Sequence, residues 1–247
     1  FTGAPIPPGA DSIVMQEDTI LNVDESVEFK GTPKVGQWIR CAGEDISIGQ
    51  VVVSKGTRLD AIHVGLLASI GIEKVKVAKR LKVGVMVTGS ELQNPGKPLR
   101  SGQIYNSNEF VWCGLLKAMN IEVESVGIVA DNFEATCNAL ESLAQCDAVI
   151  SSGGVSVGEE DHVKPAIEKV GELRAWKVAM KPGKPIAFGH INRKGGGQSW
   201  FFGLPGNPVS AAVTLDLLVQ PALRLLSGET VAAATSLQAK AAVAIRK

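Results

Sequence analysis

The chain has 247 residues, of which 45% are hydrophobic and 20% are charged, the balance of an ordinary globular protein with a substantial core. Its 25 basic and 25 acidic side chains cancel, so the overall charge gives no reason to expect nucleic acid or a membrane surface as a partner. No apolar run reaches the roughly 18 residues that a membrane-spanning helix needs, and the four cysteines form no C-x-x-C pair, which argues against a zinc site and favours a reducing, cytoplasmic compartment.

Residues 1–80 are predicted to form a separate, smaller and β-rich part. Asp60 is a suitable helix cap and Gly71 a suitable helix stop. Because the sequence begins at Phe1, inside a predicted loop, we expect material to be missing at both ends. The elements expected in this part are strands at 12–15, 26–29, 51–54 and 73–78 and a helix at 60–70.

Residues 81–228 alternate between strand and helix patterns, which predicts one α/β domain. Its expected architecture is a doubly wound, mostly parallel sheet with helices on both faces. A glycine turn over 193–197 predicts that the last two strands form a hairpin. Residues 229–247 are expected to begin a further, strand-rich domain. The expected strands lie at 82–87, 122–129, 148–151, 173–179, 185–190 and 199–202, and the expected helices at 107–119, 133–144, 164–170 and 209–226.

A glycine-rich loop follows the buried strand predicted over 148–151. Consecutive backbone N–H groups around Gly153 and Gly154 could turn toward one anion, and the Ser156 hydroxyl could add a donor. A plain turn that needs glycine only for its backbone dihedrals explains the same residues equally well. The loop is not a G-x-G-x-x-G fingerprint, which disfavours a nicotinamide cofactor.

Acidic residues follow three predicted strands. They are Glu91, then Asp131, and then Glu159, Glu160 and Asp161. Carboxylates beside a phosphate site would repel the ligand unless a cation such as Mg²⁺ bridged them to phosphate oxygens. For any one of these residues alone, a simpler role is favoured. Asp131 could be the N-cap of the next helix, for example.

Three lysines precede or occupy a proline-stiffened loop. Lys177 lies in the strand predicted over 173–179, and Lys181 and Lys184 lie between that strand and the next, in the sequence KPGKP. A stiff loop would preorganise ammonium groups for an anionic ligand. The alternative interpretation is a solvated basic turn.

The sequence GLPGNP, residues 203–208, precedes the predicted helix over 209–226. Pro205 and Asn207 in this loop are candidate substrate-binding residues, because backbone N–H groups and the helix dipole can face a ligand there. A tight strand-to-helix corner is the alternative interpretation. Neither this loop nor the rest of the chain contains a readable Ser/His/Asp triad.

Together these motifs resemble the molybdopterin molybdenumtransferases, the family of bacterial MoeA proteins and the gephyrin E-domain. The resemblance extends over nearly the whole chain, in the order of the family. The matching stretches are residues 2–18, 43–49, 88–92, 102–108, 151–164, 177–189 and 203–211.

The resemblance implies a molybdenum insertase with a MogA-like α/β module. Such enzymes take adenylylated molybdopterin, molybdate and a divalent cation, usually Mg²⁺, and they release AMP. It also implies a homodimer and a C-terminal β-domain, which would be largely absent from this chain. The implied roles are catalysis by Asp45, Glu91, Lys177 and Lys181, substrate binding by Thr2, Gly153, Gly154 and Ser156, and metal binding by Asp131 and Asp161.

Three other functions remain open. Molybdopterin adenylyltransferase has an α/β module similar to residues 81–228, although the opening sequence TGAPIPPGAD and the sequence GEDI argue against it. A gephyrin-like scaffold that binds receptor loops is the second alternative. A nicotinamide oxidoreductase is the third, and the missing G-x-G-x-x-G fingerprint argues against it.

Overall fold

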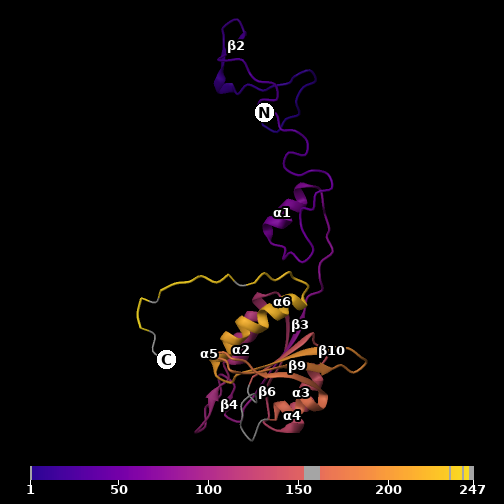
Figure 1. The fold of residues 1–247 in the computed structure, drawn as a ribbon, viewed down its shortest axis with the longest axis vertical. Helices are drawn as coiled ribbons and strands as arrows, with labels where there is room; N and C mark the ends of the chain where they lie inside the picture. The colour runs from indigo at the N-terminus through magenta and orange to yellow at the C-terminus, as the bar shows by residue number, and fades with distance from the viewer. Residues whose placement is uncertain (1, 153–161, 234, 241, 245–247) are drawn as a thin grey trace. The chain divides into compact units, whose positions relative to one another are not determined.

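The computed structural model describes residues 2–152, 162–233, 235–240 and 242–244, with the backbone alone at 175–177. The chain divides into two compact units, Phe1–Ser54 with Asp60–Ile72 and Lys55–Leu59 with Glu73–Lys247. Figure 1 traces both units along the chain.

The first unit has little regular structure among its described residues. A short 3₁₀ turn, Gln16–Asp18, leads into a hairpin of β1 (Thr19–Leu21) and β2 (Val27–Phe29). Helix α1 (Ala61–Ser69) follows, and its N-terminus is capped by Asp60 in a reciprocal capping box with His63. The helix predicted over 60–70 is therefore confirmed.

Three strands predicted in the first 80 residues were wrong. The structure forms no strand at 12–15, 51–54 or 73–78, whereas the prediction at 26–29 agrees with β2. In the described part of the first unit, Leu67 is the one buried side chain. A short apolar run becomes a strand only where a partner strand and a buried face are available, and these runs have no such face.

The second unit is built on a six-stranded sheet in the order β6-β3-β7-β10-β9-β8. Strands β6, β3, β7 and β10 are parallel, and β9 runs antiparallel to both β10 and β8. This confirms the doubly wound, mostly parallel sheet and the predicted hairpin. The strands are β3 (Lys82–Thr88), β6 (Glu122–Val129), β7 (Ala148–Ser152), β8 (Gly171–Lys177), β9 (Pro185–Asn192) and β10 (Gln198–Leu204).

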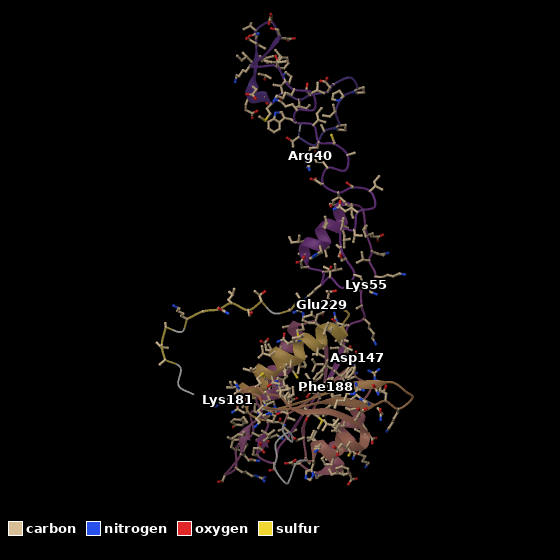
Figure 2. The ribbon with its side chains drawn as sticks, in the orientation of Figure 1. Arg40, Lys55, Asp147, Lys181, Phe188 and Glu229 are labelled. Atoms are coloured by element: carbon tan, nitrogen blue, oxygen red, sulfur yellow. The ribbon has the colours of Figure 1, made fainter. Side chains whose placement is uncertain are left out.

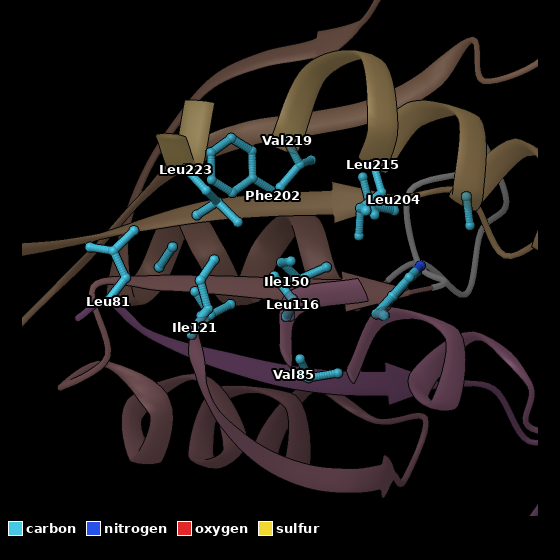
Figure 3. Packing of buried hydrophobic residues seen from close by; sticks show 14 of the residues in the cluster. Leu81, Val85, Leu116, Ile121, Ile150, Phe202, Leu204, Leu215, Val219 and Leu223 are labelled. Atoms are coloured by element: carbon cyan, nitrogen blue, oxygen red, sulfur yellow. The ribbon is translucent and has the colours of Figure 1, made fainter. Parts of the chain in front are cut away.

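Helices cover both faces of this sheet (Figure 1). Helix α2 (Asn108–Ala118) and the run from α5 (Pro208–Thr214) to α6 (Gln220–Leu226) bury one apolar cluster, shown in Figure 3. On the other face, α3 (Phe133–Leu143) and α4 (Val163–Val170) bury a second cluster. Two separate cores on opposite faces are what a parallel sheet with crossover helices requires.

The predicted helix over 209–226 is interrupted by a π-helical segment, Leu215–Val219. Pro221 supplies a physical reason, because it has no N–H for the Leu217 carbonyl and its ring crowds that carbonyl. The run Pro208–Leu226 has 19 residues and a mean hydropathy of 1.5, so it is long and apolar enough to cross a membrane. Asp216, Gln220 and Arg224 interrupt the apolar residues of this run, and its Leu215 and Val219 side chains pack in the core of the second unit.

Loops outside the sheet contain a small pair of strands and a backbone hydrogen bond between segments that are distant in the sequence. Strands β4 (Leu92–Gln93) and β5 (Ile104–Tyr105) pair in the loop after β3. The Thr230 N–H donates to the Gly56 carbonyl at 2.9 Å, so the segment after α6 is joined to residues 55–59. Among the described residues beyond Gly228, no helix or strand is formed.

Candidate functional site

Strand register brings the carboxyl ends of four strands to one edge of the sheet. Thr88 of β3 lies opposite Val129 of β6, and Val87 lies opposite Ser152 of β7. Ser152 in turn lies opposite Leu204, the last residue of β10. The loops after β3, β6, β7 and β10 therefore all begin along this line, which we call the carboxyl edge.

The lysine-bearing loop reaches the same edge because β9 is antiparallel to its neighbours. Ala187 near the start of β9 lies opposite Gly203 near the end of β10, and Lys177 at the end of β8 lies opposite Pro185. The connection from β8 to β9, with Lys181 and Lys184, must lie at the carboxyl edge. Figure 2 shows Lys181 and Asp147, which precedes β7, at opposite ends of the sheet.

The chain order creates a switch point beside β3. After β3 the chain passes through α2 to β6, which pairs with one side of β3. It then passes through α3 to β7, which pairs with the other side of β3. Helix α2 follows β3 and helix α4 follows β7, and the two helices pack on opposite faces, so the chain leaves these neighbouring strands toward opposite faces of the sheet. Ligands of open α/β sheets bind in the crevice at such a point, outside the carboxyl ends of the strands.

A buried polar network links three loops at the carboxyl edge. Thr88 Oγ1 donates to the Ser152 carbonyl at 3.1 Å. Asn108 Nδ2 donates to Ser152 Oγ at 3.0 Å and to the Gly206 carbonyl at 2.8 Å. Sequence reasoning assigned no role to Thr88 or Asn108. The one available signal was the position of both residues next to predicted element ends, and the contacts themselves are between distant parts of the sequence.

The acidic residue Asp131 does not cap the helix that follows it. Asn132, not Asp131, is the N-cap of α3, since its Oδ1 accepts the Ala135 N–H at 2.9 Å. The N-cap interpretation of Asp131 was therefore wrong. Its carboxylate is exposed after β6 and has no hydrogen bond or ion pair to any other residue that the structure describes.

Glu91 lies in the loop after β3, on the strand that neighbours β6. Its carboxylate folds back over Gly89, where an added Cβ would lie 2.7 Å from Oε2. Gly89 also has a φ of +152°, a backbone conformation that strains any other residue, whereas the flexible Glu91 side chain could move away from an added Cβ. Glu91 and Asp131 are therefore two carboxylates on adjacent loops of the carboxyl edge.

The loop with Lys181 and Lys184 is anchored on α5. Gly183 is buried with a φ of +104°, and an added Cβ would lie 2.5 Å from Thr214 Oγ1 and 2.7 Å from Met180 Cε. Both lysine side chains are exposed and have no partner among the described residues. The loop is thus held in place by a buried glycine while its charges face outward.

Comparison with known proteins gives the family. Residues 84–225, more than half of the chain, match the family described as a probable molybdopterin binding domain. Residues 1–71 match the MoeA N-terminal region, domains I and II. The chain belongs to the molybdopterin-binding family, in its MoeA branch.

Relatives in the MoeA branch match nearly the whole chain. A molybdopterin molybdenumtransferase of Haemophilus influenzae is 49% identical over 232 residues, covering 93% of this chain and 56% of the relative. Gephyrin of Dictyostelium discoideum is 38% identical and is covered over 35% of its length. Two solved structures of the MoeA protein of Pyrococcus horikoshii have a TM-score of 0.72, with 34% and 30% identity, and cover 90% and 92% of this chain and 55% and 54% of theirs. The chain spans about half the length of the molybdenumtransferase relatives that it matches.

Two of the predicted site residues lie in the first unit, within the MoeA N-terminal region. Asp45 forms an ion pair with Arg40, which also pairs with Glu44 at 3.6 Å. Thr2 is exposed in a turn. The Asp45 loop borders an open concavity of about 450 Å³, lined by Arg40, Cys41, Gly43, Glu44, Asp45, Ile46, Ser69 and Ile70.

The loop from β10 to α5 has a structural role in this MoeA-branch fold. Asn207 caps α5 by accepting the Ser210 N–H at 3.1 Å, and Pro205 is buried. The alternative interpretation of this loop, a tight corner between a strand and a helix, therefore agrees with the structure. Substrate binding by Pro205 and Asn207 stays a prediction.

Several predicted site residues lie outside the described residues, namely Gly153, Gly154, Ser156 and Asp161, and Lys177 is described by its backbone alone. Within the described part of the chain, no group of three or more His, Cys, Asp or Glu residues is arranged to hold a metal ion. Asp131 is the described member of the predicted metal pair.

Proposed function

We propose that this chain supplies the substrate-handling part of a molybdopterin molybdenumtransferase. The reaction transfers molybdenum from molybdate to adenylylated molybdopterin and releases AMP. The observation that carries the proposal is the convergence of acidic and lysine-bearing loops at one edge of a molybdopterin-binding domain. The molybdenumtransferase relatives support the same activity.

The charges at the carboxyl edge suit two anionic reactants. Molybdate and a phosphoanhydride repel each other, so bringing them together needs cations and hydrogen-bond donors already in position. Lys181 and Lys184 offer two ammonium groups that have no partner among the described residues, and they lie on an anchored loop. Their role is to neutralise and orient oxyanions, and this chemistry needs no nucleophile from the protein.

A Mg²⁺ ion fits the carboxylates of this edge. Magnesium prefers hard oxygen ligands and commonly uses one or two carboxylates together with substrate phosphates. Asp131 presents an exposed carboxylate that pairs with no residue in the part of the chain that the structure describes. We propose that Asp131 and Asp161 hold the ion with Glu91 nearby, and the bound ion would supply neutralisation of charge on the phosphate oxygens.

We further propose a cytoplasmic homodimer in which Thr2 and Asp45 contribute to substrate binding and catalysis. Exposed apolar side chains on the run from α5 to α6 support the dimer, because a partner subunit could cover them. Val209 is 66% exposed, Leu217 56% and Leu225 60%. Light scattering, which gives the molar mass in solution, tests the dimer directly.

Release of AMP from adenylylated molybdopterin tests the activity. We expect release that requires both molybdate and Mg²⁺, and a rate at least about 100-fold lower when Asp131→Asn and Lys181→Ala are combined. Lys181→Ala removes a cation that faces the developing negative charge, and Asp131→Asn weakens the proposed Mg²⁺ site. A matched control is Lys194→Ala, since Lys194 is 83% exposed at the other end of the sheet.

Two results would contradict the proposal. One is AMP release that the double variant leaves unchanged. The other is formation of adenylylated molybdopterin from Mg-ATP and molybdopterin, which would assign an adenylyltransferase instead.

A further inference from the structure

Asn108 occupies a position that the proposed reaction does not yet explain. It is the first residue of α2, but its side chain does not cap that helix. Both hydrogens of its amide nitrogen are used elsewhere, one toward Ser152 at the end of β7 and one toward Gly206 in the loop from β10 to α5. Asn108 is 8% exposed and Ser152 is 2% exposed, so water competes weakly for these bonds.

The base of this side chain is rigid. Trp112 and Leu116 follow Asn108 at intervals of four residues on the same face of α2, and they are 1% and 0% exposed in the core. The amide is therefore fixed relative to the sheet. One planar group therefore connects the start of α2 both to the end of β7 and to the loop that contains Pro205 and Asn207.

We propose that Asn108 is a positioning residue for the nucleotide part of the substrate. It acts through Ser152 and Gly206 by fixing the loop from β10 to α5 relative to the start of α2 and the end of β7. This inference rests on the proposed function, since it assumes that the loop from β10 to α5 contacts adenylylated molybdopterin. Removal of the Asn108 amide would leave two acceptors, Ser152 Oγ and the Gly206 carbonyl, without this donor, which costs free energy because the groups are shielded from water.

The test compares Asn108→Ala with the wild-type chain in two measurements. These are the affinity for AMP by calorimetry and the split between KM and kcat for AMP release from adenylylated molybdopterin. We expect both the Kd for AMP and the KM to rise about tenfold, the effect of one or two lost hydrogen bonds, while kcat changes much less. In Asn108→Asp a carboxylate faces the Gly206 carbonyl, so we expect a loss at least as large.

A double-mutant cycle separates the direct contact from a general effect. Ser152→Ala removes one acceptor, and we expect Asn108→Ala combined with Ser152→Ala to be no worse than Asn108→Ala alone, because the two residues act as a unit. Leu116→Val is the stability control. It weakens the core of the same helix, so we expect a lower Tm with an unchanged Kd and KM.

Failure of this inference is distinguishable from failure of the proposed function. If the wild-type chain releases no AMP and binds none, the proposed function is wrong. If the wild-type chain is active and Asn108→Ala behaves like Leu116→Val, losing stability with unchanged Kd and KM, then Asn108 is merely structural and the inference is overturned. Full additivity of Asn108→Ala and Ser152→Ala would also overturn it.

Discussion

Burial changes the chemistry of Cys146, at the end of the sheet away from the candidate site. Loss of solvent raises the pKa of this thiol to about 11, and the nearby Glu124 carboxylate adds to the shift. The sulfur lies 3.8 Å from Glu124 Oε2, and Glu124 is itself paired with Lys82 at 2.6 Å. Cys146 is therefore held as a neutral thiol in the folded protein.

This gives a prediction about thiol reactivity. At pH 8, iodoacetamide should modify the exposed Cys41 and leave Cys146 unmodified until the chain is unfolded, because the thiolate is the reactive form. The folded pKa lies above that of an unfolded thiol, about 8.5. The stabilisation from the buried thiol is therefore complete below about pH 8.5 and is lost as the pH rises toward about 11. Mass spectrometry of the labelled chain gives the result, and equal labelling of both cysteines would contradict it.

The adjacent residues Asp131 and Asn132 show what the sequence leaves open at single positions. Both residue types are favoured N-caps, so composition cannot decide which one caps α3. The structure assigns the cap to Asn132 and leaves the Asp131 carboxylate without a partner among the described residues. The role of Asn108 was missed for a similar reason, because its partners lie 44 and 98 positions away in the chain.

Most helices and strands of the second unit could be predicted from hydrophobic periodicity. The strand predicted over 122–129 coincides with β6, and the helix predicted over 133–144 agrees with α3. Strands predicted at 12–15 and 51–54 failed because pairing depends on partners that a local pattern does not contain. The π-helical segment was missed, although Pro221 was a visible signal for an irregular turn.

A substitution in the lysine loop tests how that loop is anchored. Gly183→Ala places a methyl group 2.5 Å from Thr214 Oγ1 at a φ of +104°, so the loop or α5 must shift. We expect a loss of about 2–3 kcal/mol in the free energy of unfolding, measured with urea, together with weaker AMP binding.

Gly195→Ala is the matched control for this substitution. Gly195 has a φ of +99°, but nothing lies within 4 Å of an added Cβ. We expect only the dihedral cost of about 1–2 kcal/mol and unchanged AMP binding. Equal effects of the two substitutions on stability and binding would show that packing against Thr214 does not anchor the loop.

The second unit is held together by segments far apart in the chain. Residues 55–59 join residues beyond α6, where Thr230 pairs with Gly56 and its Oγ1 fills the space over that glycine. Beside them, the Arg224 guanidinium makes two hydrogen bonds to the Glu229 carboxylate. These bonds hold the pKa of Glu229 below its ordinary value of 4.5.

Glu229→Gln tests this tie. A depressed pKa means that the ion pair stabilises the fold above the unfolded value of 4.5 and that this contribution is lost as the pH falls through the folded pKa. We therefore expect a lower Tm than wild type at pH 7 and a difference that disappears in acid. Glu168→Gln, on the exposed side of α4, should change the Tm little at either pH. A difference that persists at low pH would show that lost packing, not charge, is responsible.

The carboxyl edge as a whole was predictable from one general rule, since loops after parallel strands meet at one edge. The loops that meet there begin at positions between Thr88 and Leu204, so no single motif defines the site. The lysine loop joins them only because β9 reverses direction, and the glycine turn that predicts this reversal lies at the other end of the same hairpin. Strand order, by contrast, had to come from the structure, because it depends on which helices cover which face.

The turn between β9 and β10 offers a practical handle. It lies at the end of the sheet opposite the carboxyl edge. The ammonium group of its Lys194 forms an exposed ion pair with Glu141 at 3.1 Å. A biotin or fluorophore attached there would tether the domain with its carboxyl edge turned toward the medium. An immobilised sensor for nucleotide or oxyanion could thus be built without touching any residue proposed to handle them.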